Sequence, residues 1–227
     1  MSYIQVEDLN KQYGEGEAAV LAVRGINFGI ASGEWIAIMG ESGSGKSTLL
    51  TVMGALNSPD RGKYRVDEID VYALGLEKRA DFRRNYLGFV FQSFHLIPYL
   101  TVLENVMLPL TPVNIRKKEK RAMAEEALGR VGLAGKGGRL PSQISGGEQE
   151  RVAIARAVVN NPPILLADEP TGNLDTKNTL EMMNLLQQLN SAGMTIIMVT
   201  HNSECARYAR RALRLSDGLL VGEENRG

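Results

Sequence analysis

The sequence predicts an α/β fold with an inserted helical part, and three observations support it. Continuous apolar runs at residues 163–168 and 194–200 are typical of strands in a parallel sheet that is covered on both faces. The first third alternates apolar and polar residues, for example over 4–9, which predicts a β-rich N-terminal part. From about Thr101 the pattern becomes helical and is interrupted by Pro109 and Pro112.

The elements of the first third are predicted from alternation and from turn residues. A strand-like run at 34–39 precedes a helix-like run at 48–53, and 77–84 is a charged, solvated helix. The glycine-rich segment 14–17 is a turn. The remaining predicted strands of this part are 4–9, 20–28, 61–66 and 87–91.

The rest of the chain divides into a helical middle and a final α/β third. A charged helix is predicted at 117–128, the loop 135–138 follows it, and 180–189 is an amphipathic helix. We therefore predict a single domain, 1–227, in which the helical subdomain 93–160 is inserted into a core. The core and the β-rich part are formed by 1–92 and 161–227.

Composition argues against several classes of protein, although it leaves a local basic patch possible. Of the 227 residues 44% are apolar, and Lys+Arg and Asp+Glu both number 26, so the balanced charge argues against gripping nucleic acid by bulk electrostatics. Cys205 is the only cysteine, which excludes an internal disulfide and favours a buried apolar role for it. We expect no signal peptide and no spanning helix, so a membrane role would require a second polypeptide to cross the bilayer.

Residues 40–47 read Gly-Glu-Ser-Gly-Ser-Gly-Lys-Ser, a G-x-x-x-x-G-K-S motif between the strand-like and helix-like runs. Glycines let backbone N–H groups turn towards an anion, and the helix N-terminus adds positive partial charge. Lys46 would reach the β- and γ-phosphates, and the Ser47 hydroxyl can ligate Mg²⁺. The alternative, a glycine-rich turn with a stray lysine, does not explain the complete motif and its flanks. The predicted phosphate-loop contacts are Gly40, Glu41, Ser42, Gly43, Ser44, Gly45, Lys46, Ser47 and Thr48.

Two acidic residues follow a buried strand in the last third. Asp168 ends this strand at the edge where α/β sheets hold ligands and where phosphate-loop NTPases place their Mg²⁺-holding aspartate. Glu169 comes next and can face the attacking water while Asp168 serves the metal shell. An Asp-Glu pair that merely starts a turn before Pro170 is the alternative.

A second glycine-led helix start, Ser145-Gly146-Gly147-Glu148, offers another nest of N–H groups for phosphate. With Ile144 before it, this segment resembles the L-S-G-G-Q signature of the ATP-binding-cassette (ABC) family, with Ile for Leu and Glu148 for Gln. The resemblance covers essentially the whole chain, and the motifs follow the family's order. It implies a P-loop NTPase core with an N-terminal antiparallel β-subdomain and an inserted α-helical subdomain, and it implies Mg²⁺-dependent ATP hydrolysis.

The resemblance also assigns roles to single residues. Tyr13 matches the aromatic residue that stacks on adenine, with a tyrosine packed in the core as the alternative. Gln92 matches the Q-loop glutamine, Asp175 lies in the D-loop, and His201 matches the switch histidine, for which a polar strand cap is the alternative. The implied catalytic residues are Lys46, Gln92, Glu169 and His201; the implied Mg²⁺ contacts are Ser47, Gln92 and Asp168; the further ATP contacts are Tyr13, Gln92, Ser145, Gly146, Gly147, Glu148, Asp168 and Asp175.

In this family two cassettes clasp two ATP molecules head to tail. By resemblance, a γ-phosphate held by Lys46 would also touch Ser145 and Gly147 of the partner subunit. A homodimer through the phosphate-loop, signature and D-loop faces is therefore expected. Its closure would be both the catalytic switch and the power stroke, because phosphoryl transfer depends on positioning and charge stabilisation.

The patterns at 89–98, 103–110 and 166–175 resemble lipoprotein-release (LolD-type), macrolide-export (MacB-type) and cell-division (FtsE-type) ATPases. The resemblance implies a bacterial protein, peripheral on the cytoplasmic face of the inner membrane. An integral membrane permease would contact the helical subdomain near 94–100, unless these residues are internal packing. No nucleic-acid partner is expected.

Two other functions stay open. A soluble ABC ATPase of DNA repair or translation would carry a coiled-coil insertion, tandem cassettes or a basic surface, and this sequence has none of them. A regulatory module that signals through a membrane partner without transport, as in the cell-division relatives, is not separated from a transporter. The cargo is not encoded here, because specificity lies in the partner.

Overall fold

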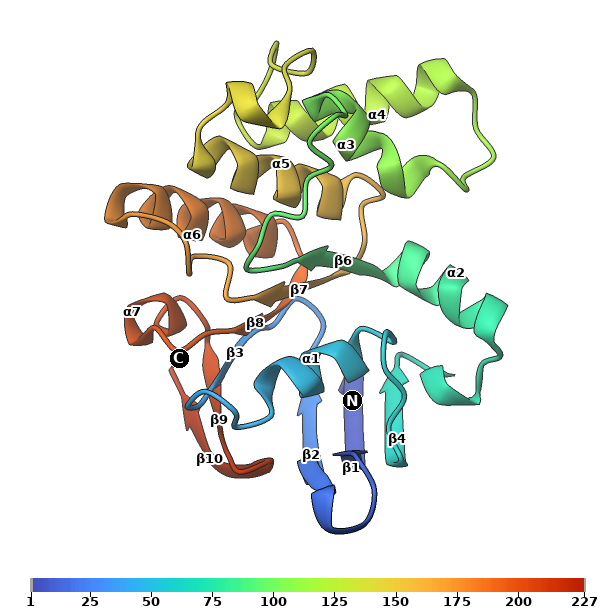
Figure 1. Ribbon diagram of the computed structural model, residues 1–227, viewed down its shortest axis with the longest axis vertical. Coiled ribbons are helices and arrows are strands. Elements are labelled where there is room, and N and C mark those ends of the chain that lie inside the picture. The colour runs from blue at the N-terminus through green and yellow to red at the C-terminus, as the bar shows by residue number, and fades with distance from the viewer. Residues whose placement is uncertain (1, 227) are drawn as a thin grey trace.

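A six-stranded central sheet runs through the middle of the molecule, of which the computed structural model describes residues 2–226 (Figure 1). Its strand order is β10-β9-β3-β8-β7-β6, and every neighbouring pair except β9–β10 is parallel. The predicted mostly parallel sheet is confirmed. Its strands are β3 (Trp35–Met39), β6 (Leu87–Val90), β7 (Ile164–Asp168), β8 (Thr195–Val199), β9 (Arg211–Ser216) and β10 (Leu219–Asn225).

Both faces of this sheet are covered by apolar side chains. Trp35 and Ala37 of β3 belong to one buried cluster, whereas Ile36 and Ile38 belong to another. Because successive side chains of a strand point to opposite faces, the two clusters lie on opposite sides of the sheet. The central strands of this sheet have no solvent-exposed face, which is why β7 and β8 read as continuous apolar runs.

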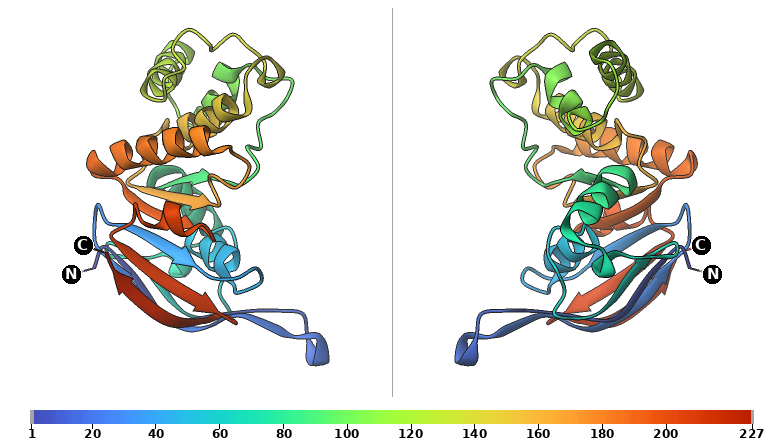
Figure 2. Two further views of the ribbon diagram at one scale, coloured as in Figure 1. Left: turned by 90° about the vertical axis from the view of Figure 1, so that its left-hand side faces the viewer. Right: turned by 90° about the vertical axis from the view of Figure 1, so that its right-hand side faces the viewer.

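A smaller antiparallel sheet forms the N-terminal part, with the order β2-β1-β4-β5. The β1–β2 hairpin extends beyond the rest of the molecule (Figure 2). The inner face of the sheet shares a buried cluster with Leu49 and Met53 of α1 (Lys46–Met53). The predicted antiparallel N-terminal sheet is therefore confirmed. Its strands are β1 (Ile4–Tyr13), β2 (Val20–Ile30), β4 (Arg61–Val66) and β5 (Ile69–Asp70).

Three helices from the middle of the chain gather at the end of the molecule opposite the antiparallel sheet (Figure 1). The first begins at a capping box, in which Glu104 N–H donates to Thr101 Oγ1 and Thr101 N–H donates to Glu104 Oε2, and it ends before Pro109. They are α3 (Val102–Met107), α4 (Lys117–Arg130) and α5 (Gly146–Val158). All three lie within 93–160, whose division from the core as a subdomain stays a prediction.

The remaining helices cover the central sheet. α6 contributes Met182 and Leu186 to the cluster that also holds α5. None of the helices within residues 2–226 combines the length and the apolar character that crossing a membrane requires. These helices are α2 (Leu76–Tyr86), α6 (Thr176–Ser191) and α7 (Ser203–Ala206).

The sequence patterns missed the C-terminal hairpin of β9 and β10. Its arginines and glutamates look like a polar tail, but they pair across the two strands: Arg211 Nη1 lies 2.9 Å from Glu223 Oε1 and Arg214 Nη2 lies 3.0 Å from Glu224 Oε1. Cross-strand pairs of opposite charge stabilise a sheet edge. The turn between the two strands is Asp217-Gly218, both with positive φ, a pair that is typical of two-residue hairpins.

Candidate active site

The phosphate-loop motif connects β3 to the start of α1. Gly43 and Gly45 have φ angles of 80° and 98°, in the left-handed region that glycine tolerates best. A Cβ at Gly43 would meet no atom within 4 Å, so this part of the loop faces open space. Lys46 Nζ donates hydrogen bonds to the Gly40 and Glu41 carbonyls at 2.8 and 2.7 Å, which folds the side chain back along its own loop.

The loop forms one wall of a cavity of about 650 Å³. Gln92, Glu169 and His201 come to the same cavity from the ends of three neighbouring parallel strands, β6, β7 and β8. Its volume is within the ordinary range of ligand sites. Residues lining the cavity are Ala22, Glu41, Ser42, Gly43, Gly45, Lys46, Ser47, Thr48, Gln92, Glu169 and His201. All these residues except Ala22 stand in or beside the predicted motifs, and no sequence signal singled out Ala22.

The acidic pair divides its contacts between the loop and the histidine. Ser47 Oγ donates to Asp168 Oδ1 at 3.2 Å, and burial raises the pKa of Asp168 above its ordinary value. Glu169 has a φ of 48°, an uncommon conformation for a residue with a side chain. Its Oε1 accepts the His201 backbone N–H at 3.1 Å and lies 2.8 Å from His201 Nδ1. Ser47 thus contacts Asp168, and His201 contacts Glu169. These four side chains lie together at one edge of the central sheet.

The segment after Glu169 is tied to Gln92. Asn173 Nδ2 donates to the Gln92 carbonyl at 2.9 Å, and a Cβ at Gly172 would lie 3.1 Å from Gln92 Nε2. The Q-loop and D-loop segments are therefore in contact beside the cavity.

The signature residues stand apart from this cavity and do not line it. Ser145 caps α5, and its Oγ accepts the Glu148 N–H at 3.3 Å. Asp175 caps α6 by accepting the Asn178 N–H at 2.8 Å, which is the main cause of its lowered pKa. A Cβ at Gly147 would lie 2.7 Å from Asn178 Cγ. The signature helix, α5, therefore packs closely on Asn178, the residue that donates to Asp175.

Tyr13 also lies outside the cavity lining. It ends β1 with 44% of its surface exposed, and its hydroxyl accepts a hydrogen bond from Asn57 Nδ2 at 2.6 Å. Lys11 Nζ lies 5.5 Å from the centre of its ring. The side chain is not packed in the core, and its role towards adenine stays a prediction.

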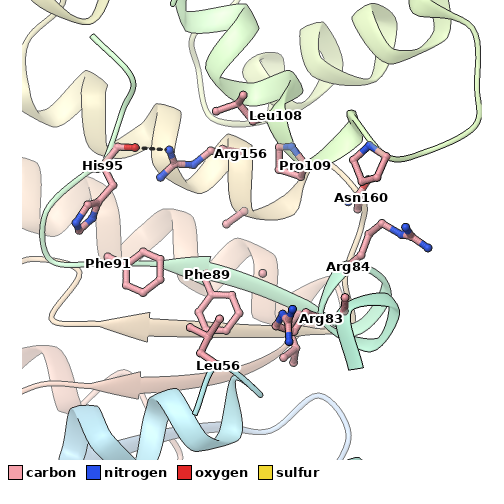
Figure 3. Close-up of a pocket in the computed structure, with 15 residues that line it drawn as sticks. Leu56, Arg83, Arg84, Phe89, Phe91, His95, Leu108, Pro109, Arg156 and Asn160 are labelled. Atoms are coloured by element: carbon pink, nitrogen blue, oxygen red, sulfur yellow. Dashed lines mark hydrogen bonds between the residues drawn. The ribbon is translucent and has the colours of Figure 1, made fainter. Parts of the chain in front are cut away.

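A second cavity, of about 540 Å³, opens between β6 and α5 (Figure 3). Leu56, Phe89 and Phe91 give it an apolar and aromatic wall. Arg156 of α5 donates from Nη1 to the His95 carbonyl at 2.6 Å and from Nη2 to the Phe94 carbonyl at 2.7 Å. The signature helix therefore holds the segment that follows Gln92. Sequence reasoning assigned no role to Arg156, because its partners lie more than sixty positions away.

The segment 94–100 contributes less to this cavity than expected. Of its residues only His95 is among the lining, and the ring of His95 stands edge-on to Phe91 at 5.5 Å. Leu96 packs against the buried cluster of the helices. Asn105 holds Ile97 through hydrogen bonds to its N–H and its carbonyl, at 2.7 and 3.1 Å. Leu96 and Ile97 are thus engaged within the chain.

Comparison with known proteins agrees with the geometry. Residues 23–172 match the ABC transporter family. The lipoprotein-releasing system ATP-binding protein LolD of Geobacter metallireducens is 48% identical over 98% of this chain and 99% of its own length. The macrolide export ATP-binding/permease protein MacB of Chlorobium luteolum is also 48% identical over 98% of this chain, which spans only 33% of that protein.

Solved structures agree as well. A dimeric post-hydrolysis structure of the ATP-binding cassette MJ0796, bound to ADP and phosphate, superposes with a TM-score of 0.90 at 42% identity and covers 99% of both chains. A second dimeric MJ0796 structure gives the same TM-score at 43% identity. The chain belongs to the ATP-binding subunits of the ABC transporter family, which bind and hydrolyse ATP.

Proposed function

We propose that this chain is the ATP-hydrolysing subunit of a bacterial ABC transporter of the lipoprotein-release or macrolide-export type. Closure of a dimer of two such chains on ATP would drive a separate membrane permease. The observation that carries the proposal is the convergence of Lys46, Gln92, Glu169 and His201 on one cavity, while the Ser145 helix start lies outside it. A second nest of N–H groups would then come from a second copy.

The residues of the cavity suit hydrolysis. Lys46 and the N–H groups of the loop would stabilise the charge of the phosphates. Glu169 would orient the attacking water and accept its proton, and His201 would hold the carboxylate on one side and reach the γ-phosphate on the other. Asp175 would make the contact between subunits. The contact between Asn173 and Gln92 would let the intersubunit face and the Q-loop respond together.

Mg²⁺ would fit between Ser47, which lines the cavity, and Asp168, which lies beside it. Ser47 Oγ and Asp168 Oδ1 lie 3.2 Å apart, and a hydroxyl and a carboxylate are ligands that Mg²⁺ accepts. Within residues 2–226 no group of three or more His, Cys, Asp or Glu side chains could hold a metal alone. That arrangement suits an ion that keeps several waters and shares the phosphates of a nucleotide. When bound, Mg²⁺ would neutralise charge on the phosphates, with Ser47, Asp168 and Gln92 as its protein contacts.

The cavity at β6 and α5 supports a permease partner. Its aromatic wall suits the apolar face of an amphipathic helix, and Arg83 and Arg84 add positive charge at its rim. The chain would therefore sit on the cytoplasmic face of the inner membrane, docked on that helix. Arg156 would report movement of the signature helix to the docking surface through Phe94 and His95.

Detergent extraction with a tagged chain tests the proposal. We expect a permease, identified by mass spectrometry, to copurify with the tagged chain, and the isolated chain to hydrolyse ATP. Leu56→Glu places a charge in the cavity between β6 and α5, where the permease helix would bind. It should abolish copurification, while the isolated chain should still hydrolyse ATP. Leu76→Glu is the matched control, because Leu76 is 81% exposed and is not among the cavity lining. No membrane partner together with DNA-stimulated hydrolysis would overturn the proposal.

A further inference from the structure

Glu148 of the signature motif forms an ion pair with Lys136, a lysine to which the proposed hydrolysis assigns no role. Lys136 Nζ contacts Oε1 of Glu148, whose side chain is only 14% exposed. The other carboxylate oxygen of Glu148 accepts the Ser145 N–H at 2.8 Å. Glu148 therefore uses one oxygen to cap α5 and the other to meet Lys136.

Lys136 is presented from a well-anchored loop. Its N–H donates to the Leu133 carbonyl at 3.1 Å, and the Leu103 N–H at the start of α3 donates to the Gly137 carbonyl at 2.9 Å. A Cβ at Gly137 would lie 3.3 Å from Leu103 Cβ, so the loop lies directly on α3. The Lys136–Glu148 contact thus joins the start of α5 to a support built from α3.

The charge of Glu148 has opposite consequences for the helix and for the proposed ligand. A carboxylate in the first turn stabilises a helix, because it faces the positive end of the dipole. The same helix start is expected to receive a phosphate, and an unpaired carboxylate beside it would repel that anion. The hydrogen bonds from Lys136 and from the Ser145 N–H lower the pKa of Glu148 to about 2, so the group is ionised at neutral pH.

We propose that Lys136 is a positioning residue of the signature site. It neutralises Glu148 and holds it as the cap of α5, so that the N–H groups of Gly146 and Gly147 can receive the γ-phosphate of ATP bound by a partner subunit. The inference rests on the proposed dimeric ATP site. The inference also depends on Glu148, because a glutamine at this position would carry no charge to neutralise.

A double-mutant cycle tests the inference in a Glu169→Gln background, where the ATP-bound dimer is expected to accumulate. The ATP concentration for half-maximal dimerisation is measured by analytical ultracentrifugation. In a chain with Glu148, Lys136→Met should raise this ATP concentration by about tenfold or more. In a chain that already carries Glu148→Gln, the same substitution should raise it by less than about twofold. Lys136→Arg, which keeps the charge, should restore dimerisation. ATP affinity of the monomer should not change, because Lys136 does not line the cavity of the phosphate loop.

Salt separates the electrostatic role from a packing role. Raising the ionic strength to about 1 M shortens the screening length to about 3 Å. The difference between Lys136→Met and the double variant in the ATP concentration for half-maximal dimerisation should therefore become smaller at high salt. The inference would be overturned if Lys136→Met and the double variant weakened dimerisation equally at every salt concentration. It would also be overturned if Lys136→Met did not weaken dimerisation. If Lys136→Met failed to fold, Lys136→Gln would replace it in the same cycle. Failure of Glu169→Gln itself to dimerise would instead count against the proposed function.

Discussion

Oε1 of Glu169 lies 2.8 Å from Nδ1 of His201 and also accepts the backbone N–H of that histidine. The two residues follow β7 and β8, adjacent parallel strands in which Asp168 pairs with Val199. Glu169 N–H donates to the Val199 carbonyl at 2.9 Å, which holds its backbone in the left-handed conformation. Strained backbone of this kind persists where its surroundings hold it, and it is common at catalytic sites. The Glu169 carboxylate and the His201 imidazole are therefore held in one fixed arrangement.

Glu169→Gln should nearly abolish hydrolysis while ATP still binds. The amide oxygen can keep the hydrogen bond from the His201 N–H, but an amide cannot accept a proton from water. Loss of general-base catalysis costs about 100-fold or more in rate. Phosphate release measures turnover, equilibrium dialysis measures ATP binding, and sedimentation should show a dimer trapped on ATP. Turnover near the wild-type rate would contradict the role of Glu169.

Lys46→Ala should weaken ATP binding. Lys46 is 9% exposed, and its ammonium group donates hydrogen bonds to the Gly40 and Glu41 carbonyls at the edge of the cavity. Removal of this charge leaves only N–H dipoles to attract the phosphates, and we expect affinity to fall about tenfold or more. Isothermal titration calorimetry gives the affinity. Lys78→Ala on the exposed face of α2 is the control, and equal affinities of the two variants would contradict the assignment.

Gly147→Ala should destabilise the fold by about 1 kcal/mol, because its Cβ would push aside the end of the Asn178 side chain and break a hydrogen bond. Asn178 in turn donates from Nδ2 to Asp175 Oδ2 at 2.9 Å, so the displacement would also disturb the D-loop. Both the melting temperature and the extent of ATP-dependent dimerisation should decrease. Gly146→Ala is the matched stability control, since a Cβ there meets nothing within 4 Å in this chain. Equal melting temperatures for the two variants would show that Asn178 yields without cost.

Glu150→Gln should alter the dependence of stability on pH. Burial raises the pKa of Glu150 from 4.5 to about 8, although Arg156 opposes this, and its buried Oε1 has no hydrogen-bond partner. Between these pH values the folded chain holds a proton that the unfolded chain releases, so the free energy of unfolding falls as pH rises. Stability from the neutral carboxyl is complete below pH 4.5 and lost above about 8.

Melting temperatures at pH 5 and pH 8 measure this effect. The wild-type chain should lose more stability than Glu150→Gln over this interval, by an amount on the order of a few kcal/mol. Parallel curves for the two proteins would mean that the Glu150 carboxyl is solvated.

Much of the fold and the family could be predicted from the sequence, because their signals are local. The phosphate loop is one contiguous segment between a strand and a helix, and buried parallel strands are uninterrupted apolar runs. The comparisons confirm the family and the fold class. The hairpin of β9 and β10 was not predicted, although its turn residues Asp217 and Gly218 are a local hairpin signal.

The sequence by itself determined that the chain binds a nucleotide phosphate and which residues could serve it. Only the tertiary structure decided that Gln92, Glu169 and His201 share a cavity with Lys46. It also decided that Lys136 meets Glu148. The physical reason is that strand order and helix packing, which arise from the burial of apolar surface across the whole chain, bring together side chains whose separation in the sequence carries no signal.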